Sequence, residues 1–361
     1  MKTAIIIPLV CIAMIACSHA ATPNENAVPA IDPETEALID KLTDVVEVGY
    51  GYAGGFGGSQ FLPDKNSGAI GVLLFGSQRP KNSETLEAIV RRGAKAMPSL
   101  LKHLDDPRET KIPAMSGMMW TIYPDEYDFN RCLRKESPNG VNKGMNAAFG
   151  EKNSGKHTMT VGDLCFVAIG QIVNRNFTAV HYQPSGGLAV NSPTYSPALC
   201  VAVREEFQNL TEAKHRELLL EDFHKPDSTS RRNEAIRRIA FYYPEIYEGL
   251  VLKQLSEPVD DKQGLIEALI SYKTPRITDM IYNIFSKTPQ PQDGDHVRHD
   301  DEYLLLACMK YLIGTGHDDT IRACCLKQIE LGNNSKDAGK RNISGQYYRI
   351  LEAVDAKDTQ T

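Results

Sequence analysis

Two similar stretches in the C-terminal half decide the fold: residues 243–258 read YPEIYEGLVLKQLSEP, and residues 274–289 read TPRITDMIYNIFSKTP. Each has a proline at its second position and another at its last, and corresponding prolines are 31 residues apart (244 to 275, 258 to 289). Proline is tolerated in the first turn of a helix, where its missing N–H would have no partner, but it cannot continue a helix. Each stretch therefore predicts one helix that begins at a proline and stops before the next one.

Apolar residues in and around these stretches recur at steps of three and four, which is typical of one face of an α-helix. They are Ile236, Ile239, Ala240, Ile246, Leu250, Leu255, Ile266, Leu269, Ile270, Ile277, Ile281, Phe285, Leu305, Cys308, Tyr311, Leu312, Ile321, Cys325 and Ile329. One helix pair cannot bury such a face alone, whereas stacked pairs form a continuous core. The pattern predicts a row of helix–turn–helix units, closed by a final helix over 344–354.

This unit of helix, turn, helix and stop resembles the HEAT-like repeats of α-solenoids, over about 196–354 and in one further unit at about 83–107. The whole chain is also similar to uncharacterised exported bacterial proteins with HEAT-like repeats, a resemblance that implies no activity. The resemblance implies an all-α fold, a HEAT-like α-solenoid of antiparallel helix pairs. We expect an irregular, loop-rich middle, with a short β-hairpin where residues 177–182 and 188–191 flank a Gly-Gly pair.

The N-terminus has the pattern of an export signal. Lys2 is followed by an apolar run over residues 4–16, which is shorter than the ~20 residues that a membrane-spanning helix needs. Two ways of processing stay open: cleavage after residue 20, or lipidation of Cys17 in a lipobox-like sequence. We expect an exported protein, in the periplasm, on the outer membrane as a lipoprotein, or secreted.

The remaining sequence divides into four parts. Residues 21–33 are polar and proline-rich, as expected of a flexible tether. Residues 34–195 predict a helical N-terminal part with glycine-rich and irregular loops, residues 196–354 the helical repeat array, and residues 355–361 a polar tail.

Charge and hydropathy exclude several classes of protein. The formal net charge is −6 and the pI is near 5.9, which argues against a protein that coats nucleic acid. A hydrophobic fraction of 42% and a mean hydropathy of −0.33 argue against a multi-span membrane protein. We therefore expect a protein partner, no nucleic acid, and membrane contact only through a lipid anchor.

Three segments resemble nucleotide-binding or metal-binding motifs, but each lacks part of the required pattern or context. Residues 49–54 match GxGxxG without a preceding strand, and residues 150–156 match GxxxxGK but are followed by His157 in place of Ser or Thr. Residues 293–301 gather carboxylates and imidazoles, so a cation held by Asp295, His296 and His299 is the alternative to a solvated loop and helix cap. We assign no catalytic, cofactor-binding or metal-binding residue.

Cysteines outside the signal lie mostly in apolar helical runs. We expect buried thiols. A bridge from Cys308 to Cys324 or Cys325 is the alternative, because an exported protein meets an oxidising compartment.

Aromatic and arginine side chains are enriched at the energetic centres of protein interfaces. The candidates for a partner surface are Trp120, Tyr123, Tyr127, Arg131, Arg134, Arg175 and Tyr182. The alternative is that the aromatic residues, with Phe129, seal the loop region onto the helices. A second group, Arg231, Arg232, Arg237 and Arg238 with Glu234 between them, predicts a solvated basic helix face.

The sequence favours a non-enzymatic exported binding scaffold that mediates protein–protein interaction in the bacterial cell envelope. Two alternatives stay open. One is an envelope enzyme with its site in the irregular 110–200 segment, and the other is an inhibitor of a foreign protein.

Overall fold

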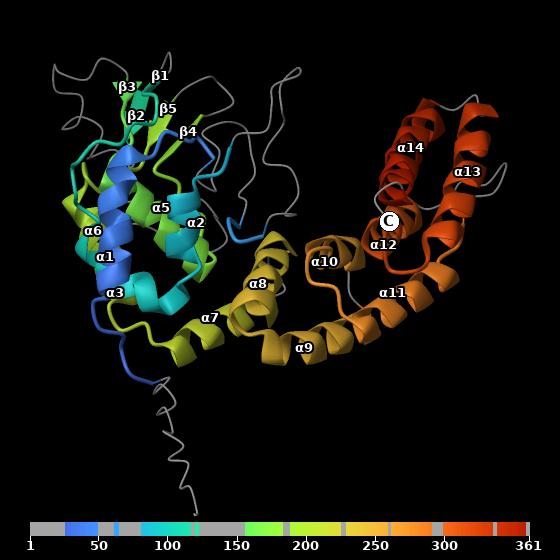
Figure 1. The fold of residues 1–361 in the computed structure, drawn as a ribbon, viewed down its shortest axis with the longest axis horizontal. Helices are drawn as coiled ribbons and strands as arrows, with labels where there is room; N and C mark the ends of the chain where they lie inside the picture. Colours follow the sequence, from blue (N-terminus) through green and yellow to red (C-terminus); the bar gives the residue numbers. More distant parts are fainter. Residues whose placement is uncertain are drawn as a thin grey trace, which may run out of the picture.

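The described part of the chain is mostly helical (Figure 1). The computed structural model describes residues 26–49, 61–64, 81–116, 120–122, 156–182, 188–224, 229–258, 261–290, 299–334 and 338–358. Predictions for the signal peptide, Cys17, Cys132, residues 50–54 and 150–155, and Asp295 and His296 lie outside these ranges. Among the described residues, no helix is both long and apolar enough to span a membrane.

The N-terminal lobe is built around one central helix, α5 (Val161–Val173), which is buried at each of its 13 residues. The other helices that contribute buried residues to the same core are α1 (Pro33–Asp40), η1 (Lys41–Asp44), α2 (Glu84–Val90), η2 (Gly93–Ala96), α3 (Met97–Lys102) and α6 (Pro197–Phe207). A capping box between Thr160 and Asp163 starts α5, and Asn174 ends it in the left-handed conformation.

Five short strands lie at one end of this lobe (Figure 1). They are β1 (Met115–Ser116), β2 (Trp120–Ile122), β3 (Lys156–His157), β4 (Val180–Tyr182) and β5 (Leu188–Val190). Strands β4 and β5 pair antiparallel, which confirms the predicted hairpin. Strand β2 joins β5 in parallel and β1 pairs with β3. Those two pairings were not predicted, because their partners are distant in sequence.

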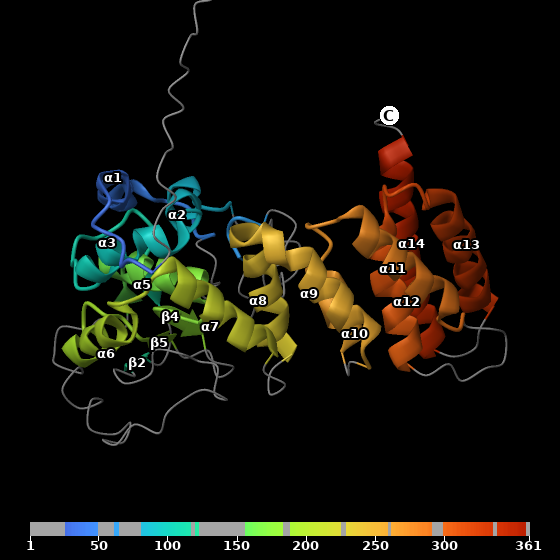
Figure 2. The ribbon, with the colours of Figure 1, turned by 90° about the horizontal axis from the view of Figure 1, so that it is seen from below.

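The C-terminal array comprises the remaining helices: α7 (Glu212–His224), α8 (Thr229–Tyr242), α9 (Pro244–Ser256), α10 (Lys262–Ala268), α11 (Pro275–Lys287), α12 (His299–Leu312), α13 (Asp318–Asn334) and α14 (Ala338–Asp358). Helices α9 and α11 begin at the predicted prolines and end two residues before the next proline, as expected. Helices α8, α10 and α12 contact one another in succession, and α9 contacts α11, so this stretch has two layers (Figures 1 and 2).

Two hydrophobic cores underlie this division. The first extends from Ile39 to Leu210 and includes the buried face of α6, and the second extends from Leu219 to Val354. In both views the lobe lies at one end of the molecule and α13 and α14 lie at the other (Figures 1 and 2). The domain boundaries drawn from the sequence stay predictions.

The five cysteines in the described ranges are buried and free: Cys165, Cys200, Cys308, Cys324 and Cys325. This confirms the expectation of buried thiols there, and the alternative bridge from Cys308 is not formed. Burial raises the pKa of the Cys308 thiol to about 12, so this thiol is unreactive at neutral pH.

Candidate functional site

The carboxyl end of α5 is where the lobe meets the array. The last carbonyl groups of a helix have no partner within it, and they carry the negative end of the helix dipole. Here the Gln171 carbonyl accepts a hydrogen bond from Arg238 Nε at 2.6 Å, and Arg175 Nη1 donates to the carbonyls of Val173 and Asn174 at 3.2 Å each. Cationic side chains therefore cap this helix end, one of them from α8.

The predicted solvated basic face is wrong for three of its four arginines. Arg231, Arg237 and Arg238 are only 5%, 9% and 1% exposed. Glu234, on the same helix, lies beside Arg237 and Arg238. Other partners come from distant parts of the chain, including the Asp64 carboxylate, 173 residues from Arg237. Local sequence patterns do not indicate partners that are distant in sequence. A cluster of arginines therefore does not by itself show whether its helix face is exposed to solvent or buried.

The Asp222 carboxylate of α7 lies close to two arginine side chains beside this helix end. Its side chain is 1% exposed and lies 2.6 Å from Arg175 Nη1 and 3.8 Å from Arg231 Nη1. The Asn174 side-chain amide donates to the same carboxylate at 2.9 Å. Arg175, a candidate for the partner surface, is thus 13% exposed and committed to internal contacts.

His215 of α7 adds a neutral contact to the junction. Its Nε2 lies 2.9 Å from the Ile172 carbonyl and its Nδ1 lies 2.9 Å from the Tyr243 hydroxyl. Because a carbonyl only accepts, neutral His215 carries its proton on Nε2. The single proton of the Tyr243 hydroxyl has two acceptors within reach, His215 Nδ1 and the Glu212 carbonyl at 3.0 Å. Burial lowers the pKa of His215 to about 4, against a weaker opposing effect of the Ile172 hydrogen bond.

A four-residue segment, Phe61 to Asp64, fills the space between the lobe and α8. Arg237 Nη1 donates to the Asp64 carboxylate at 2.8 Å, and the Ser271 hydroxyl donates to it at 2.5 Å. The Leu62 N–H donates to the Gln171 side chain at 3.0 Å. The segment therefore joins α5, α8 and the turn after α10 through one short piece of chain.

A polar row continues from this junction across three helices of the array; we use the name for Glu234, Arg237, Glu267 and Lys310. Arg237 Nε lies 3.5 Å from Glu234 Oε1, and its Nη2 donates to the Glu267 carbonyl at 3.3 Å. Glu267 Oε1 lies 3.2 Å from Lys310 Nζ, with side chains 36% and 38% exposed. The row runs from α8 through α10 to α12, and its last pair reaches solvent.

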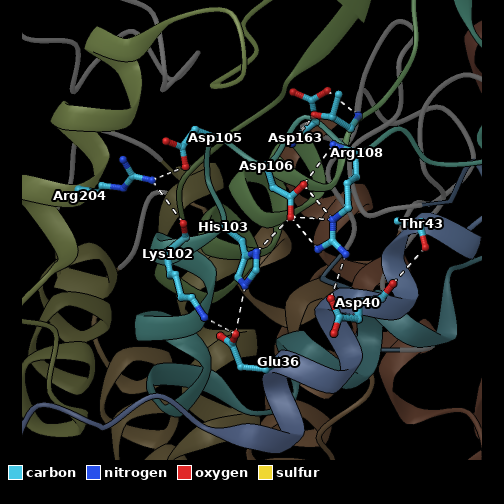
Figure 3. A network of polar contacts seen from close by, with 11 residues as sticks. Glu36, Asp40, Thr43, Lys102, His103, Asp105, Asp106, Arg108, Asp163 and Arg204 are labelled. Carbon is cyan, nitrogen blue, oxygen red and sulfur yellow. Dashed lines mark hydrogen bonds and ion pairs between the residues drawn. The ribbon is translucent and has the colours of Figure 1, made fainter.

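A second polar network lies on the lobe, where α1 faces α3 and the turn after it (Figure 3). Glu36 lies 2.7 Å from Lys102 Nζ and 3.1 Å from His103 Nε2, while His103 Nδ1 lies 3.1 Å from Asp106. Arg108 bridges Asp106 at 2.7 Å and Asp40 at 3.0 Å. The carboxylates therefore occupy both ring nitrogens, and the network ties α1 to α3.

Hydrogen bonds decide the charge state of the two carboxyls in this network. Burial acts to raise the pKa of Glu36, but hydrogen bonds from Lys102 and His103 lower it overall. Burial opposes ionisation of Asp106 as well, and contacts with Arg108 and His103 leave its pKa lowered. Both groups are thus held as anions, which suits a structural ion-pair network better than proton transfer.

One buried histidine has the composition of a catalytic triad without its geometry. His157 Nε2 lies 2.8 Å from Asp163 Oδ2, and both side chains are 0% exposed. The nearby Ser192 hydroxyl lies 2.7 Å from the Thr194 hydroxyl, and among the described residues no group hydrogen-bonds to His157 Nδ1. Burial acts to raise the pKa of Asp163 while His157 lowers it overall. A triad requires the nucleophile to contact the imidazole, and in the described part of the chain this pair lacks that contact.

Two further candidates for the partner surface fall in one row of the sheet. Trp120 of β2 and Tyr182 of β4 both pair with Leu188 of β5, which separates them by one strand. Tyr123, Tyr127, Arg131 and Arg134 lie outside the described ranges, as does Phe129. The register thus brings together two candidates that are 62 positions apart in sequence (120 to 182).

The sequence reading missed Asp64, Gln171, His215 and Asp222, which are the polar groups of the junction. One signal was present: Phe-Leu-Pro-Asp at 61–64 interrupts a glycine-rich region with apolar and charged residues. Of the proposed cation ligands, His299 begins α12. In the part of the chain that the structure describes, no group of three His, Cys, Asp or Glu side chains is arranged to hold a metal ion.

Comparisons with known proteins add no assignment to this geometry. The chain matches no protein-family model, no curated protein and no solved structure.

Proposed function

We propose that the chain is a non-enzymatic scaffold that binds a protein partner through the inner layer of a HEAT-like helical array. The arrangement of α8, α10 and α12 as successive neighbours, with α9 and α11 behind them, supports this proposal (Figure 1). Arrays of this kind present extended surfaces to protein partners, because each unit contacts only its neighbours.

The observation that carries the proposal is the polar row across the inner layer. In its outer pair, the side chains of Glu267 and Lys310 are each more than one-third exposed. An ion pair this exposed contributes little to stability, about 0–1 kcal/mol. Charges of alternating sign on a rigid surface instead favour the choice and orientation of a charged partner.

The N-terminal sequence supports a location for this scaffold outside the cytoplasm. The apolar run over residues 4–16 supports export from the cytoplasm. Cys17, if lipidated, would hold the array at the outer membrane through the polar stretch 21–33. The scaffold then acts in the bacterial cell envelope, on a partner in the periplasm or at the membrane.

Site-specific photo-crosslinking in intact envelopes tests the proposal with the full chain. A benzophenone amino acid is placed at Lys310 on α12 or, as a matched exposed control, at Lys253 on α9. We expect a discrete protein adduct from position 310 and none from position 253. Adducts from position 253 only, or from neither position, would contradict binding through the inner layer.

A charge exchange separates partner recognition from stability. Lys310→Glu breaks the pair with Glu267, whereas Lys310→Glu with Glu267→Lys restores an ion pair of reversed direction. Because these variants change position 310 itself, the benzophenone is moved to position 303, two turns earlier on the same face of α12. If the row recognises a charged partner, both variants lose this adduct although the double variant keeps the melting temperature of the parent. An adduct that survives in the double variant would remove the row from the binding surface.

A further inference from the structure

The segment Phe61–Asp64 is an irregular piece of chain that is buried between the lobe and α8. It belongs to no described helix or strand, and glycine-rich sequence precedes and follows it. Even so, Phe61 and Leu62 have no exposed surface and Asp64 is 2% exposed. A connecting segment normally runs over the surface, because a buried one must find partners for its backbone polar groups.

Side chains of the lobe satisfy the backbone of this segment. The Gln171 side chain of α5 accepts from the Leu62 N–H at 3.0 Å, and Arg91 Nη2 donates to the Pro63 carbonyl at 3.4 Å. Recognition of main-chain groups by fixed side chains gives affinity for a peptide in one register.

The end groups of the segment are recognised by charge and by aromatic contact. Asp64 accepts from Arg237 at 2.8 Å and from Ser271 at 2.5 Å. The Arg238 guanidinium lies 4.7 Å from the centre of the Phe61 ring, and Phe241 and Tyr242 meet that ring edge-on at 5.6 and 5.8 Å. A buried carboxylate on arginine and a cation–π contact are both selective for the chemistry of the occupant.

The groups that hold the segment are positioned by contacts of their own. Arg238 is fixed by the Gln171 carbonyl at 2.6 Å and by Glu234 at 3.1 Å. The Tyr242 hydroxyl donates to the Val90 carbonyl at 2.6 Å, and Arg91 binds Glu87 at 2.6 Å. A site whose side chains are already held loses little conformational entropy when an occupant enters.

We propose that this junction is a peptide-binding site, filled in this structure by the chain's own residues 61–64. The ligand class is a short peptide with an aromatic residue, an aliphatic residue, proline and a carboxylate in that order. A tethered occupant has a high effective concentration, in the millimolar range for short flexible connections, so a free peptide must compete with it. The site thus admits a partner's peptide when the internal segment is displaced.

A synthetic peptide tests this proposal with the purified full chain. The probe is a capped hexapeptide with the sequence of residues 60–65, Gln-Phe-Leu-Pro-Asp-Lys, and the receptor is the variant Phe61→Ala with Asp64→Ala. We expect saturable binding by calorimetry, at least about tenfold weaker for the parent chain, whose site is occupied. We expect about tenfold weaker binding when Asn replaces Asp in the peptide, because the charge-assisted bond to Arg237 is lost.

A receptor variant checks the assigned contact. Adding Arg237→Met to the emptied chain should remove the preference for the Asp peptide over the Asn peptide. No binding to the folded emptied variant, or equal binding of a scrambled peptide, overturns the proposal. If the emptied variant does not fold, refolding with the Asp peptide should recover its helical circular dichroism, and failure to recover it overturns the proposal equally. The exposed pair Glu267–Lys310, on which the scaffold proposal rests, is left unchanged in this experiment, so failure here leaves that proposal standing.

Discussion

Helices α5 and α11 are both 13 residues long, yet they are buried in opposite ways. Every residue of α5 is buried, whereas α11 buries only Ile277, Ile281 and Phe285. The first is the centre of a lobe and needs neighbours on all sides, while the second contributes one seam to a layer. The difference shows that one chain combines a helix enclosed on every side with helices that bury a single face.

The largest expected effect is a matched pair of core deletions that measures this difference. Ile169→Ala in α5 and Ile281→Ala in α11 both truncate a side chain that is 0% exposed. We expect a loss of about 4 kcal/mol in the free energy of unfolding for α5 and about 2 kcal/mol for α11, because the array relaxes around a cavity more easily. Urea unfolding measures both, and equal losses would contradict the comparison.

Removing the buried carboxylate at the junction is the next largest test. Asp222→Asn leaves Arg175 and Arg231 without their shared anion, in a place where Asp222 is 1% exposed. Because an uncompensated buried charge is costly, we expect a loss of about 3 kcal/mol in the free energy of unfolding. If the lobe and the array of the Asp222→Asn variant melt in separate calorimetric transitions while the parent melts in one, the Asp222 contacts couple the two parts in the parent. A loss below about 1 kcal/mol would show that it does not.

Acid should weaken the same junction through His215. Its pKa is about 4 in the folded chain and 6.5 in the unfolded chain, so the unfolded chain binds more protons between these values. Its contribution is therefore complete above pH 6.5 and is lost as the pH falls towards 4, by about 2 kcal/mol at pH 5.

The control for this pH dependence is His215→Gln, which keeps hydrogen-bonding groups but does not titrate. Chemical unfolding at several pH values should give a flatter stability curve between pH 6.5 and 4 for the variant than for the parent. Identical slopes would assign the acid sensitivity to other groups.

The smallest effect is expected at the far end of the array, where charge pairs are exposed. Asp355 lies 2.9 Å from Arg322 Nη2, with side chains 56% and 29% exposed. We expect Asp355→Ala to change the free energy of unfolding by less than about 0.5 kcal/mol. A loss comparable to that of Asp222→Asn would remove the distinction between the junction and the surface of the array.

Local patterns predicted the array better than the junction. The starts of α9 and α11 at Pro244 and Pro275 follow from the missing proline N–H, and the seam of α11 follows from its four-residue spacing. Likewise, Gly-Gly between two β-prone runs was enough to predict the β4–β5 pair. In each case the determining residues lie within one or two turns of one another.

Only the tertiary structure decided which partners the buried arginine side chains contact. Nothing near Arg237 in sequence indicates Asp64, and nothing near Arg238 indicates the end of α5, 67 residues earlier. The sequence by itself determined the helices and their apolar faces, because these depend on local backbone geometry and side-chain periodicity. The burial of the arginines, the seating of residues 61–64 and the meeting of the two cores depend on partners brought together only by folding.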